Sequence, residues 1–193
     1  MYNYYPDIRV VRTRKALREA LIDLLQDAPY ELVQVTEIAQ KALINRVTFY
    51  NHYASKDELM EEILDLALDN YSALTQQFNP ASDSYDAPAK VEKYIRINFE
   101  HYEKHAKLYR ILLSDSFPSY REKFIGIMQD SIRQVLSNSQ NKSNLDDADF
   151  AFFTEWYVGG TIQTVLSYIN NPNRPTAEEI AQRTMRLNSQ TFY

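Results

Sequence analysis

Cysteine is absent from this 193-residue chain, and glycine occurs only three times. A chain without cysteine has no disulfide, no thiolate metal site and no cysteine nucleophile. No stretch approaches the run of about 18 apolar residues that a membrane-spanning helix needs, so we expect no membrane partner. The N-terminus also lacks the apolar run of a secretory signal, which leads us to expect a cytoplasmic protein. Scarce glycine and long helical periodicities together predict an all-α fold.

The charges are unevenly distributed along the chain. The net charge is −5, which is unusual for a protein that binds nucleic acid, but residues 1–56 carry a net charge of +2 and residues 57–193 a net charge of −7. Five early cations lie within ten residues: Arg9, Arg12, Arg14, Lys15 and Arg18. A basic end on an acidic chain fits an N-terminal part that contacts phosphate. Such a cluster is also common on a solvated helix face.

Apolar residues recur at helical spacing along most of the chain and predict about nine helices. The first three are expected at residues 8–28, 35–43 and 46–53. The others are expected at 55–78, 89–104, 108–113, 118–137, 147–169 and 176–187, with loops at 79–88 and 140–147. Capping boxes at Ser55–Glu58 and Thr176–Glu179 start two of these helices. We therefore predict a three-helix N-terminal domain in residues 1–56 and a larger C-terminal helical bundle in residues 57–193.

The short turn between the second and third predicted helices is typical of a helix-turn-helix, whose later helix enters the major groove of DNA. On the third helix, Phe49 and Tyr53 fall on the inner side. Arg46, Thr48 and Tyr50 fall on the outer side, where they can form hydrogen bonds with base edges and phosphate oxygens. The alternative is a packing helix in an ordinary helical bundle.

A longer motif surrounds this third helix. The run TEIAQKALINRVTFYNHYASKDELMEEIL, residues 36–64, resembles the DNA-binding region of TetR/AcrR-family transcriptional regulators, of a type common in low-GC Gram-positive bacteria. The matching residues are Ile38-Ala39, Thr48-Phe49-Tyr50, His52-Tyr53 and Ser55-Lys56 with Leu59. The motif match extends over roughly residues 8–66. The rest of the chain resembles the family only in outline, as a variable all-helical domain that binds an inducer and dimerises.

The resemblance implies a sequence-specific transcriptional repressor rather than an enzyme. It would bind a pseudo-palindromic operator in double-stranded DNA as a homodimer, and a small-molecule effector would change its operator affinity. The implied DNA-binding residues are Thr36, Asn45, Arg46, Val47, Thr48, Tyr50, His52 and Lys56. Within this set, His52 and Lys56 are expected at phosphates. The alternative is a TetR-like activator or co-regulator that a protein partner controls.

Two positions depart from the family's pattern. Leu43 stands where the turn usually contains glycine, so the left-handed turn is expected to be either strained or replaced by a different turn. Gln34 stands where a threonine usually caps the second helix, and glutamine is a poorer cap. Both departures affect the residues that hold the third helix in position.

The C-terminal region is rich in aromatic residues, which at helical spacing are usually core. From the resemblance we expect some of them to form an effector pocket, bordered by Phe99, Tyr102, Tyr120, Phe124 and Trp156. His101 and His105 are four residues apart and could form a metal pair, but no third ligand is evident and a solvated helix face is favoured. No catalytic constellation stands out, and we predict no metal and no cofactor.

The predicted helix at 147–169 is apolar almost all round, which is typical of a helix that is buried on every side. We expect it to form the dimer interface together with the helix at 176–187. The predicted contact residues are Tyr157, Thr161, Val165 and Ile169. The pair Gly159-Gly160 in the helix interior would allow close approach of a partner helix. Alternatively, these glycines make room for an aromatic side chain within one subunit.

Overall fold

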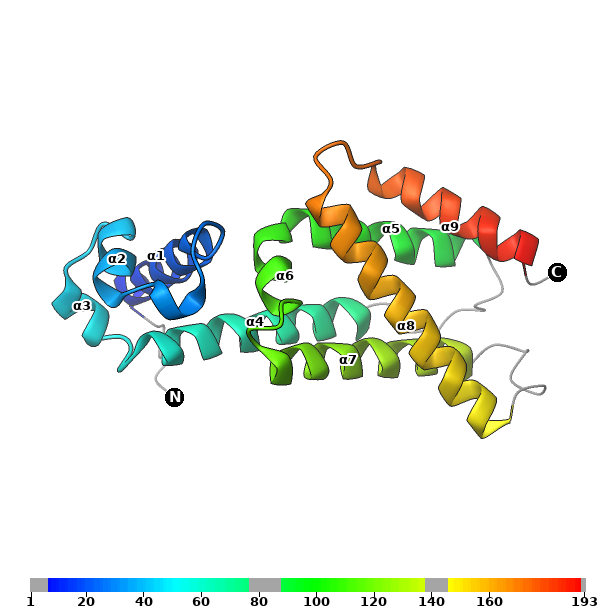
Figure 1. Ribbon diagram of the computed structural model, residues 1–193, viewed down its shortest axis with the longest axis horizontal. Helices are drawn as coiled ribbons and strands as arrows, with labels where there is room; N and C mark the ends of the chain where they lie inside the picture. Colours follow the sequence, from blue (N-terminus) through cyan, green and yellow to red (C-terminus); the bar gives the residue numbers. More distant parts are fainter. Residues whose placement is uncertain (1–6, 77–87, 138–145, 192–193) are drawn as a thin grey trace, which may run out of the picture. The chain divides into compact units, whose positions relative to one another are not determined.

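The computed structural model describes residues 7–76, 88–137 and 146–191, and the described residues are almost entirely helical (Figure 1). Their elements in chain order are α1 (Ile8–Leu24), the 3₁₀ helix η1 (Tyr30–Leu32), α2 (Val35–Lys41), α3 (Arg46–Tyr50), α4 (Lys56–Gln76), α5 (Pro88–Lys104), α6 (Ala106–Leu112), α7 (Pro118–Ser137), α8 (Asp147–Asn170) and α9 (Ala177–Thr191). The prediction of an all-α chain with about nine helices is confirmed. Most of the two predicted loops, at 79–88 and 140–147, lies outside the described residues. Within the described ranges, no helix is both long enough and apolar enough to cross a bilayer.

The capping box predicted at Thr176–Glu179 is present, and the one at Ser55–Glu58 is present in part, because the Glu58 carboxylate binds the N–H of the residue before the cap. The Glu58 N–H donates to the Ser55 hydroxyl at 3.2 Å, and the Glu58 carboxylate accepts from the Ala54 N–H at 2.5 Å. The Glu179 N–H donates to the Thr176 hydroxyl at 3.2 Å, and the Glu179 carboxylate accepts from the Thr176 N–H at 2.8 Å. These bonds satisfy N–H groups that have no partner within their own helix, and they start α4 and α9 at the positions that the sequence indicates.

The chain divides into two compact units, Met1–Ala67 and Leu68–Tyr193, which we call the head unit and the second unit. The division falls inside α4 rather than at its start, where the sequence predicted a domain boundary at residue 56. Leu59, Ile63 and Leu64 in the first half of α4 are at most 2% exposed. The first part of α4 is therefore grouped with the helix-turn-helix elements.

The core of the head unit is built from side chains of four helices. Leu17 and Leu21 of α1, Ile38 of α2, Phe49 of α3 and Leu59 of α4 are each 0% exposed. Burying an apolar side chain of this size contributes about 1.5–3 kcal/mol to the stability of a fold. Because Phe49 is anchored in this core, the opposite side of α3 is directed outward.

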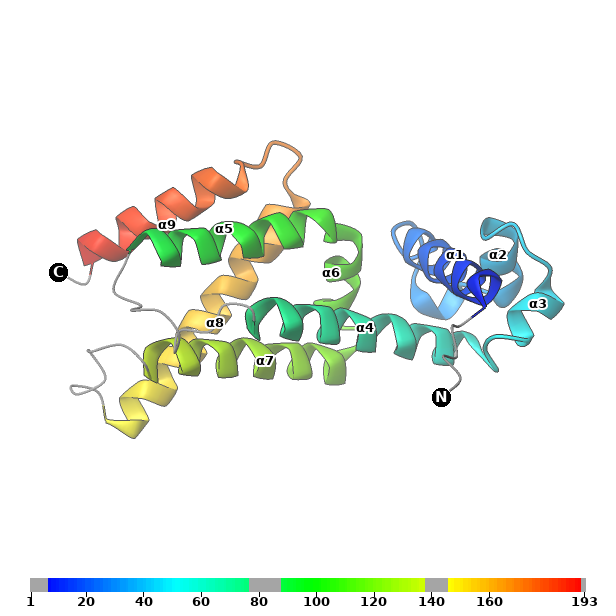
Figure 2. The same cartoon turned by 180° about the vertical axis from the view of Figure 1, so that it is seen from behind.

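The second unit is centred on an aromatic cluster. In this unit α9 lies along α5, and α8 packs on α5, α6 and α7 (Figures 1 and 2). The Tyr71 and Phe124 ring centroids are 4.6 Å apart, and the Tyr102 and Tyr109 centroids are 4.9 Å apart. The Tyr102 hydroxyl donates to the Tyr71 hydroxyl at 2.8 Å. The prediction that most aromatic residues of this region are core holds for these four, which are at most 2% exposed.

His101 packs against the same cluster and is only partly exposed, so it differs from the fully solvated helix face that the sequence favoured. Its Nε2 lies 2.9 Å from the Tyr109 hydroxyl, and its ring packs against Tyr71 and Tyr102 at centroid distances of 6.3 Å. Burial, with the nearby charges of His105 and Lys104, lowers the pKa of His101 to about 4. The imidazole is therefore neutral near pH 7 and serves as a packing and hydrogen-bonding group.

Candidate nucleic-acid interface

The turn between α2 and α3 keeps the left-handed geometry although it contains no glycine. Leu43 has φ 57° and is 93% exposed. The Leu43 N–H donates to the Gln40 carbonyl at 3.1 Å, and the Ile44 N–H donates to the Ala39 carbonyl at 3.0 Å. These two bonds form a Schellman motif, in which the residue that Leu43 occupies is usually glycine. Of the two alternatives that the sequence left open, the strained turn is the one observed.

We expect Leu43→Gly to stabilise the protein. A left-handed conformation costs a residue with a side chain about 1–2 kcal/mol, and glycine adopts it without steric conflict. Because Leu43 is 93% exposed, the substitution sacrifices almost no packing. The greater flexibility of glycine in the unfolded chain offsets part of this gain. In urea titrations the free energy of unfolding should therefore rise by about 0.5–1 kcal/mol.

The matched control is Leu32→Gly, because Leu32 is also exposed, at 69%, and does not have a positive φ. That variant should lose stability. Equal destabilisation by the two substitutions would show that Leu43 carries no strain.

The start of α2 at Gln34 is stabilised by hydrogen bonds that the sequence did not indicate. Its own N–H donates to the Glu37 carboxylate at 2.8 Å, and its carbonyl accepts from the Glu37 N–H at 3.0 Å. The carboxylate also lies in the first turn of α2, where the helix dipole favours negative charge. Glu37 thus compensates for the poorer cap at Gln34.

α3 presents its polar side chains outward. Asn45 caps the helix through its Oδ1, which accepts from the Val47 N–H at 2.8 Å. Val47 is 67% exposed and Tyr50 is 46% exposed, whereas Phe49 is 0% exposed. The Arg46 guanidinium donates to the Tyr50 hydroxyl at 3.2 Å and lies 5.5 Å from the centre of its ring. Arg46 and Tyr50 therefore support each other on the outer side of the helix.

Half of the predicted DNA-binding residues surround one surface depression of about 410 Å³. Thr36 from the start of α2, Arg46 and Tyr50 from α3, and Lys56 from the start of α4 all line it. Asn45 and Val47 are exposed beside them on α3, and Thr48 and His52 are partly exposed. The helix-turn-helix thus brings together residues from three helices that the sequence separates by up to 20 positions.

Lys56 has a structural role that the sequence did not indicate. Its ammonium donates to the Tyr30 carbonyl at 2.7 Å, the Val33 carbonyl at 2.9 Å and the Glu31 carbonyl at 3.4 Å. It also lies 4.4 Å from the centre of the Tyr30 ring. Lys56 therefore holds the segment before α2 against the start of α4. Its contact with phosphate stays a prediction, and a Lys56 variant needs a stability measurement before any loss of DNA binding is interpreted.

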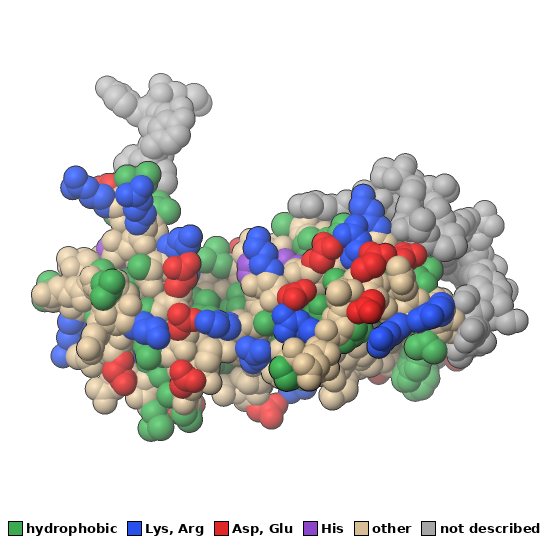
Figure 3. All heavy atoms as spheres, turned by 90° about the horizontal axis from the view of Figure 1, so that it is seen from above, with side chains coloured by type: hydrophobic (Ala, Val, Ile, Leu, Met, Phe, Trp, Pro, Cys, Tyr) green, Lys and Arg blue, Asp and Glu red, His purple; other side chains and the backbone are tan. Residues whose placement is uncertain are grey.

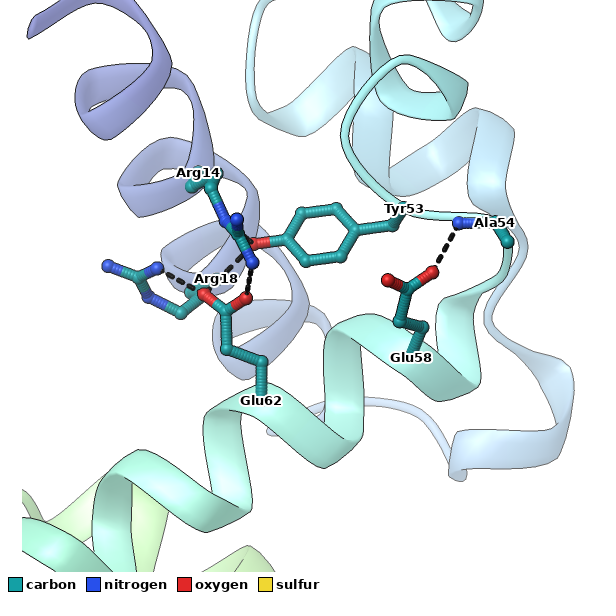
Figure 4. Close-up of polar contacts among 6 residues, drawn as sticks. All are labelled: Arg14, Arg18, Tyr53, Ala54, Glu58 and Glu62. Atoms are coloured by element: carbon teal, nitrogen blue, oxygen red, sulfur yellow. Dashed lines mark hydrogen bonds and ion pairs between the residues drawn. The ribbon is translucent and has the colours of Figure 1, made fainter. Parts of the chain in front are cut away.

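Two members of the basic cluster turn toward an acidic residue of α4 (Figure 4). The Glu62 carboxylate accepts from Arg14, from Arg18 at 2.5 Å and from the Tyr53 hydroxyl at 3.0 Å. The Arg14 Nε donates to the same hydroxyl at 3.1 Å, and its guanidinium lies 5.0 Å from the centre of the Tyr53 ring. We call these four residues the Glu62 cluster. The cluster connects α1 and α4 with Tyr53, which follows the turn at the end of α3.

Electrostatics keep the Glu62 cluster charged. Burial alone would raise the pKa of Glu62, but hydrogen bonds from Arg14, Arg18 and Tyr53 outweigh burial, and the pKa lies below its usual value. Arg14 and Arg18 thus neutralise a carboxylate rather than extending the basic surface. The exposed cations of α1 are Arg9, Arg12 and Lys15, and Lys15 lies 3.7 Å from Glu19. The charge pattern of the sequence alone does not show which cations of α1 bind Glu62 and which are exposed.

The second unit contains a cavity of about 270 Å³. Three of the five predicted pocket residues, Phe99, Tyr102 and Trp156, are among the side chains that line it. The other two are placed elsewhere. Phe124 is 1% exposed and packs against Tyr71, and Tyr120 has the Lys123 ammonium 4.5 Å from the centre of its ring. The cavity instead extends along α8 to Tyr157, Gly160, Thr161 and Thr164.

Two of the four interface residues predicted on α8, Val165 and Ile169, are each 1% exposed, so they belong to the core of their own subunit. The prediction is corrected for these two because α8 is apolar on nearly every side, and periodicity therefore did not indicate its outer face. Tyr157 and Thr161 are partly exposed and line the cavity, and their place in an interface stays a prediction. The outer face of α8 carries Phe152, Glu155, Trp156, Gly159 and Gln163.

Comparison with protein families identifies two matching segments. A family model described as "Bacterial regulatory proteins, tetR family" matches residues 17–63, and one described as "Transcriptional regulator C-terminal region" matches residues 90–190. The first segment runs from the middle of α1 to the first half of α4, and it contains the residues of the depression and every member of the Glu62 cluster except Arg14. The second runs from α5 into α9 and includes most residues of the cavity wall.

Individual proteins agree with these matches. The chain is 44% identical over 59 residues to the uncharacterized HTH-type transcriptional regulator YxbF of Bacillus subtilis (strain 168), which is 30% of this chain and 16% of that protein. It is 38% identical over 53 residues to the HTH-type dhaKLM operon transcriptional activator DhaS of Lactococcus lactis, which is 28% of either chain. A TetR transcriptional regulator from Streptococcus agalactiae has the same fold, with a TM-score of 0.64 and 21% identity over 94% of this chain and 96% of its own.

Proposed function

The chain belongs to the TetR family of bacterial transcriptional regulators, and from that membership we propose that it binds a pseudo-palindromic operator as a homodimer and responds to a small-molecule effector. Membership of the family supports DNA binding as such. The geometry of the operator, the dimer and the effector are our proposals. As a regulator of transcription it would act in the cytoplasm, where bacterial DNA lies.

The outer side of α3 carries the proposal for DNA recognition. It combines an arginine, a threonine and a tyrosine, whose donors and acceptors suit base edges and phosphates. The depression beside it adds Thr36 at the start of α2, a position from which side chains reach the DNA backbone. One head unit covers too few base pairs for useful specificity, so two heads on matched half-sites are required.

Selection from a pool of random duplexes tests this function, because the protein itself picks out its operator from the pool. The purified protein should enrich sequences in which two inverted half-sites are separated by about one helical turn or a multiple of it. Enrichment of a single asymmetric site, or no enrichment above a protein-free control, would contradict the proposal.

The cavity supports control by a small molecule rather than by a protein partner. It lies among aromatic side chains with a few polar groups, which is the usual composition of a ligand site. An effector can shift operator affinity only through a different affinity for two arrangements of the dimer. Mobility-shift titrations with and without a bound ligand measure the resulting change in operator affinity.

The outer face of α8 supports the homodimer. Phe152 is 70% exposed and Trp156 is 59% exposed, and exposed aromatic residues of this size are typical of interaction surfaces. A Cβ added at Gly159 or Gly160 would meet nothing within 4 Å, so these glycines do not make room for a neighbour in the same chain. By contrast, acidic and basic side chains are interspersed over the face of α5 and α9 (Figure 3). We therefore place the apolar part of the interface on α8.

We expect Gly159→Arg to convert the dimer into monomers. Within one chain a Cβ at this position meets nothing within 4 Å, and arginine favours a helix over glycine by roughly 0.8 kcal/mol, so the subunit itself should remain folded. Across a close helix pair, the same side chain would bring bulk and like charges together. Sedimentation velocity should show half the mass of the wild type, and operator binding should weaken.

Gly126→Arg on α7 is the matched control, because a Cβ there also meets nothing within 4 Å. It should leave the dimer intact. If Gly159→Arg remains dimeric and binds the selected DNA normally, the interface does not include this face.

A further inference from the structure

Resting on the proposed binding of an operator, we propose that Arg46 and Tyr50 act as one unit that reads a guanine in each half-site. Arg46 donates to the two acceptors that guanine presents in the major groove. Tyr50 is a positioning residue, which holds the Arg46 guanidinium on the outer side of α3.

A continuous set of side-chain contacts connects the Arg46 guanidinium to the core of the head unit. Phe49 is 0% exposed, and the Tyr50 ring packs edge-on against it, with centroids 5.5 Å apart and an interplanar angle of 82°. Arg46 lies four positions before Tyr50, so the two side chains are neighbours on the helix surface. The guanidinium donates to the Tyr50 hydroxyl at 3.2 Å and lies 5.5 Å from the centre of the ring. The Tyr50 ring therefore limits the positions that the guanidinium can take.

Most donors of the Arg46 guanidinium are left for a partner outside the protein. Its Nη2 donates to Tyr50, and among the described residues no carboxylate forms an ion pair with it. Arg14 and Arg18 differ, because both pair with Glu62. Arg46 therefore keeps its positive charge uncompensated and offers a set of N–H groups in a fixed plane.

Guanine is the base that complements this set of donors. In the major groove it presents N7 and O6, two acceptors side by side. Adenine presents an acceptor next to a donor, thymine presents an acceptor next to a methyl group, and cytosine presents a donor. Because a guanidinium only donates, guanine alone can accept two of its N–H groups at once. Stacking on Tyr50 also removes part of the rotational freedom of Arg46 before DNA binds, which favours a directional contact.

The neighbour of Arg46 favours a base edge over a phosphate as its partner. Val47 is 67% exposed beside it on α3. An apolar side chain gains from contact with the methyl group of thymine, but it gains nothing from a charged phosphate. Arg46 and Val47 together therefore form a surface that fits the floor of the major groove better than the DNA backbone.

Exchange of single bases in the selected operator tests the proposal on the full-length protein. At one position of each half-site, replacement of the guanine–cytosine pair by adenine–thymine should weaken binding by about 5- to 150-fold. Replacement of the same guanine by 7-deazaguanine keeps the base pair and removes only the N7 acceptor. It should also weaken binding, by a smaller factor, because one of the two hydrogen bonds is lost. Competition mobility shifts measure both penalties.

Arg46→Ala provides the decisive comparison. The variant should unfold like the wild type because Arg46 is exposed, and it should bind the operator more weakly. Its penalty for 7-deazaguanine at the assigned position should disappear, because the donor that used N7 is gone. Arg12→Ala is the matched control, since it removes the same charge from an exposed cation of α1. That variant should keep the full penalty, whatever its overall affinity.

Tyr50→Phe tests the positioning role. It keeps the ring and its contact with Phe49 but removes the hydroxyl that accepts from Arg46. The penalty for exchange of the assigned guanine should shrink by about 2- to 10-fold, which is the effect of one hydrogen bond. Penalties at the other positions should stay unchanged. A general loosening of α3 would instead reduce the penalties at every position.

Three results would overturn the assignment. Equal 7-deazaguanine penalties in the wild type and in Arg46→Ala would show that Arg46 does not read the base, and selected half-sites without any guanine–cytosine pair would show the same. An unchanged penalty in Tyr50→Phe would remove the positioning role of Tyr50. Failure of the operator function is a different result, in which the selection returns no inverted half-sites of any base content, and this inference would then fall with it.

Discussion

Replacing Tyr50 by alanine is expected to weaken binding to the selected operator by about 1–3 kcal/mol, or roughly 5- to 150-fold. Tyr50 is 46% exposed on the outer side of α3, whose other side is anchored by the fully buried Phe49. Removal of the exposed ring therefore costs contacts with DNA and little packing. Binding to unrelated duplexes, which depends on phosphate contacts, should change much less. Competition mobility shifts with operator and random DNA measure both quantities.

Two further substitutions on α3 separate the contributions to recognition. Tyr50→Phe keeps the ring but removes the hydroxyl that accepts from Arg46 at 3.2 Å, so it should cost less than Tyr50→Ala. Thr48→Val removes one hydroxyl at nearly constant volume. If Thr48 contacts a base edge, that variant should relax the preference at one position of each half-site and leave the other positions unchanged.

Glu19→Gln on α1 is a suitable control, because its side chain is 64% exposed and it lies outside the predicted contact set. It should bind the operator like the wild type. Unchanged affinity and sequence preference in both Tyr50→Ala and Thr48→Val would show that α3 is not the reading helix.

Local sequence signals were sufficient for the α-helices of the head unit, although α1 and α3 end earlier than predicted and the short 3₁₀ helix η1 was not predicted. Capping residues, a helical period and a long motif place α2, the turn and α3, and each of these signals acts over a few residues. The outward direction of Val47 and Tyr50 also follows from helical spacing once Phe49 is taken as buried. The conformation of Leu43 could not be predicted from the sequence, because a turn without glycine can be either a strained left-handed turn or a turn of a different type.

Contacts between distant parts of the chain could not be predicted from these signals. Arg14 and Arg18 looked like a possible DNA-binding surface, but their partner Glu62 lies more than 40 positions later in the sequence. Lys56 likewise pairs with carbonyls 23 to 26 positions earlier. On α8, apolar residues on nearly every side concealed which of them face the core. In each case the missing information was tertiary, and periodicity contains none of it.

Glu62→Gln tests how the head unit holds α3 in position. The carboxylate accepts hydrogen bonds from two arginines and from Tyr53, the buried residue that follows the α3 turn. Hydrogen bonds to charged groups contribute about 1.5–3 kcal/mol in protected sites, but the Arg14 side chain is 41% exposed, which reduces the effect. We expect the free energy of unfolding to fall by about 2 kcal/mol near pH 7.

The pH dependence of stability distinguishes a lost ion cluster from a general packing defect. The pKa of Glu62 is lowered in the folded state, so the carboxylate contributes stability at pH values above its unfolded pKa. That contribution disappears as the pH falls through the unfolded value, near 4.5, and toward the lower folded value. The difference between wild type and Glu62→Gln should therefore be largest near neutral pH and shrink in acid. Urea titrations at a series of pH values would show it.

The same variant should also weaken DNA binding in a way that Tyr50→Ala does not. Glu62 contacts Tyr53 rather than any predicted DNA-binding residue, so its loss would let α3 move without removing a base contact. Affinity should fall for operators of every sequence, with the order of preference unchanged. Glu61→Gln, an exposed neighbour on α4, removes the same charge from the head unit without touching the cluster. If both variants behave alike in stability and in DNA binding, the Glu62 cluster has no special part in positioning α3, and only the loss of negative charge matters.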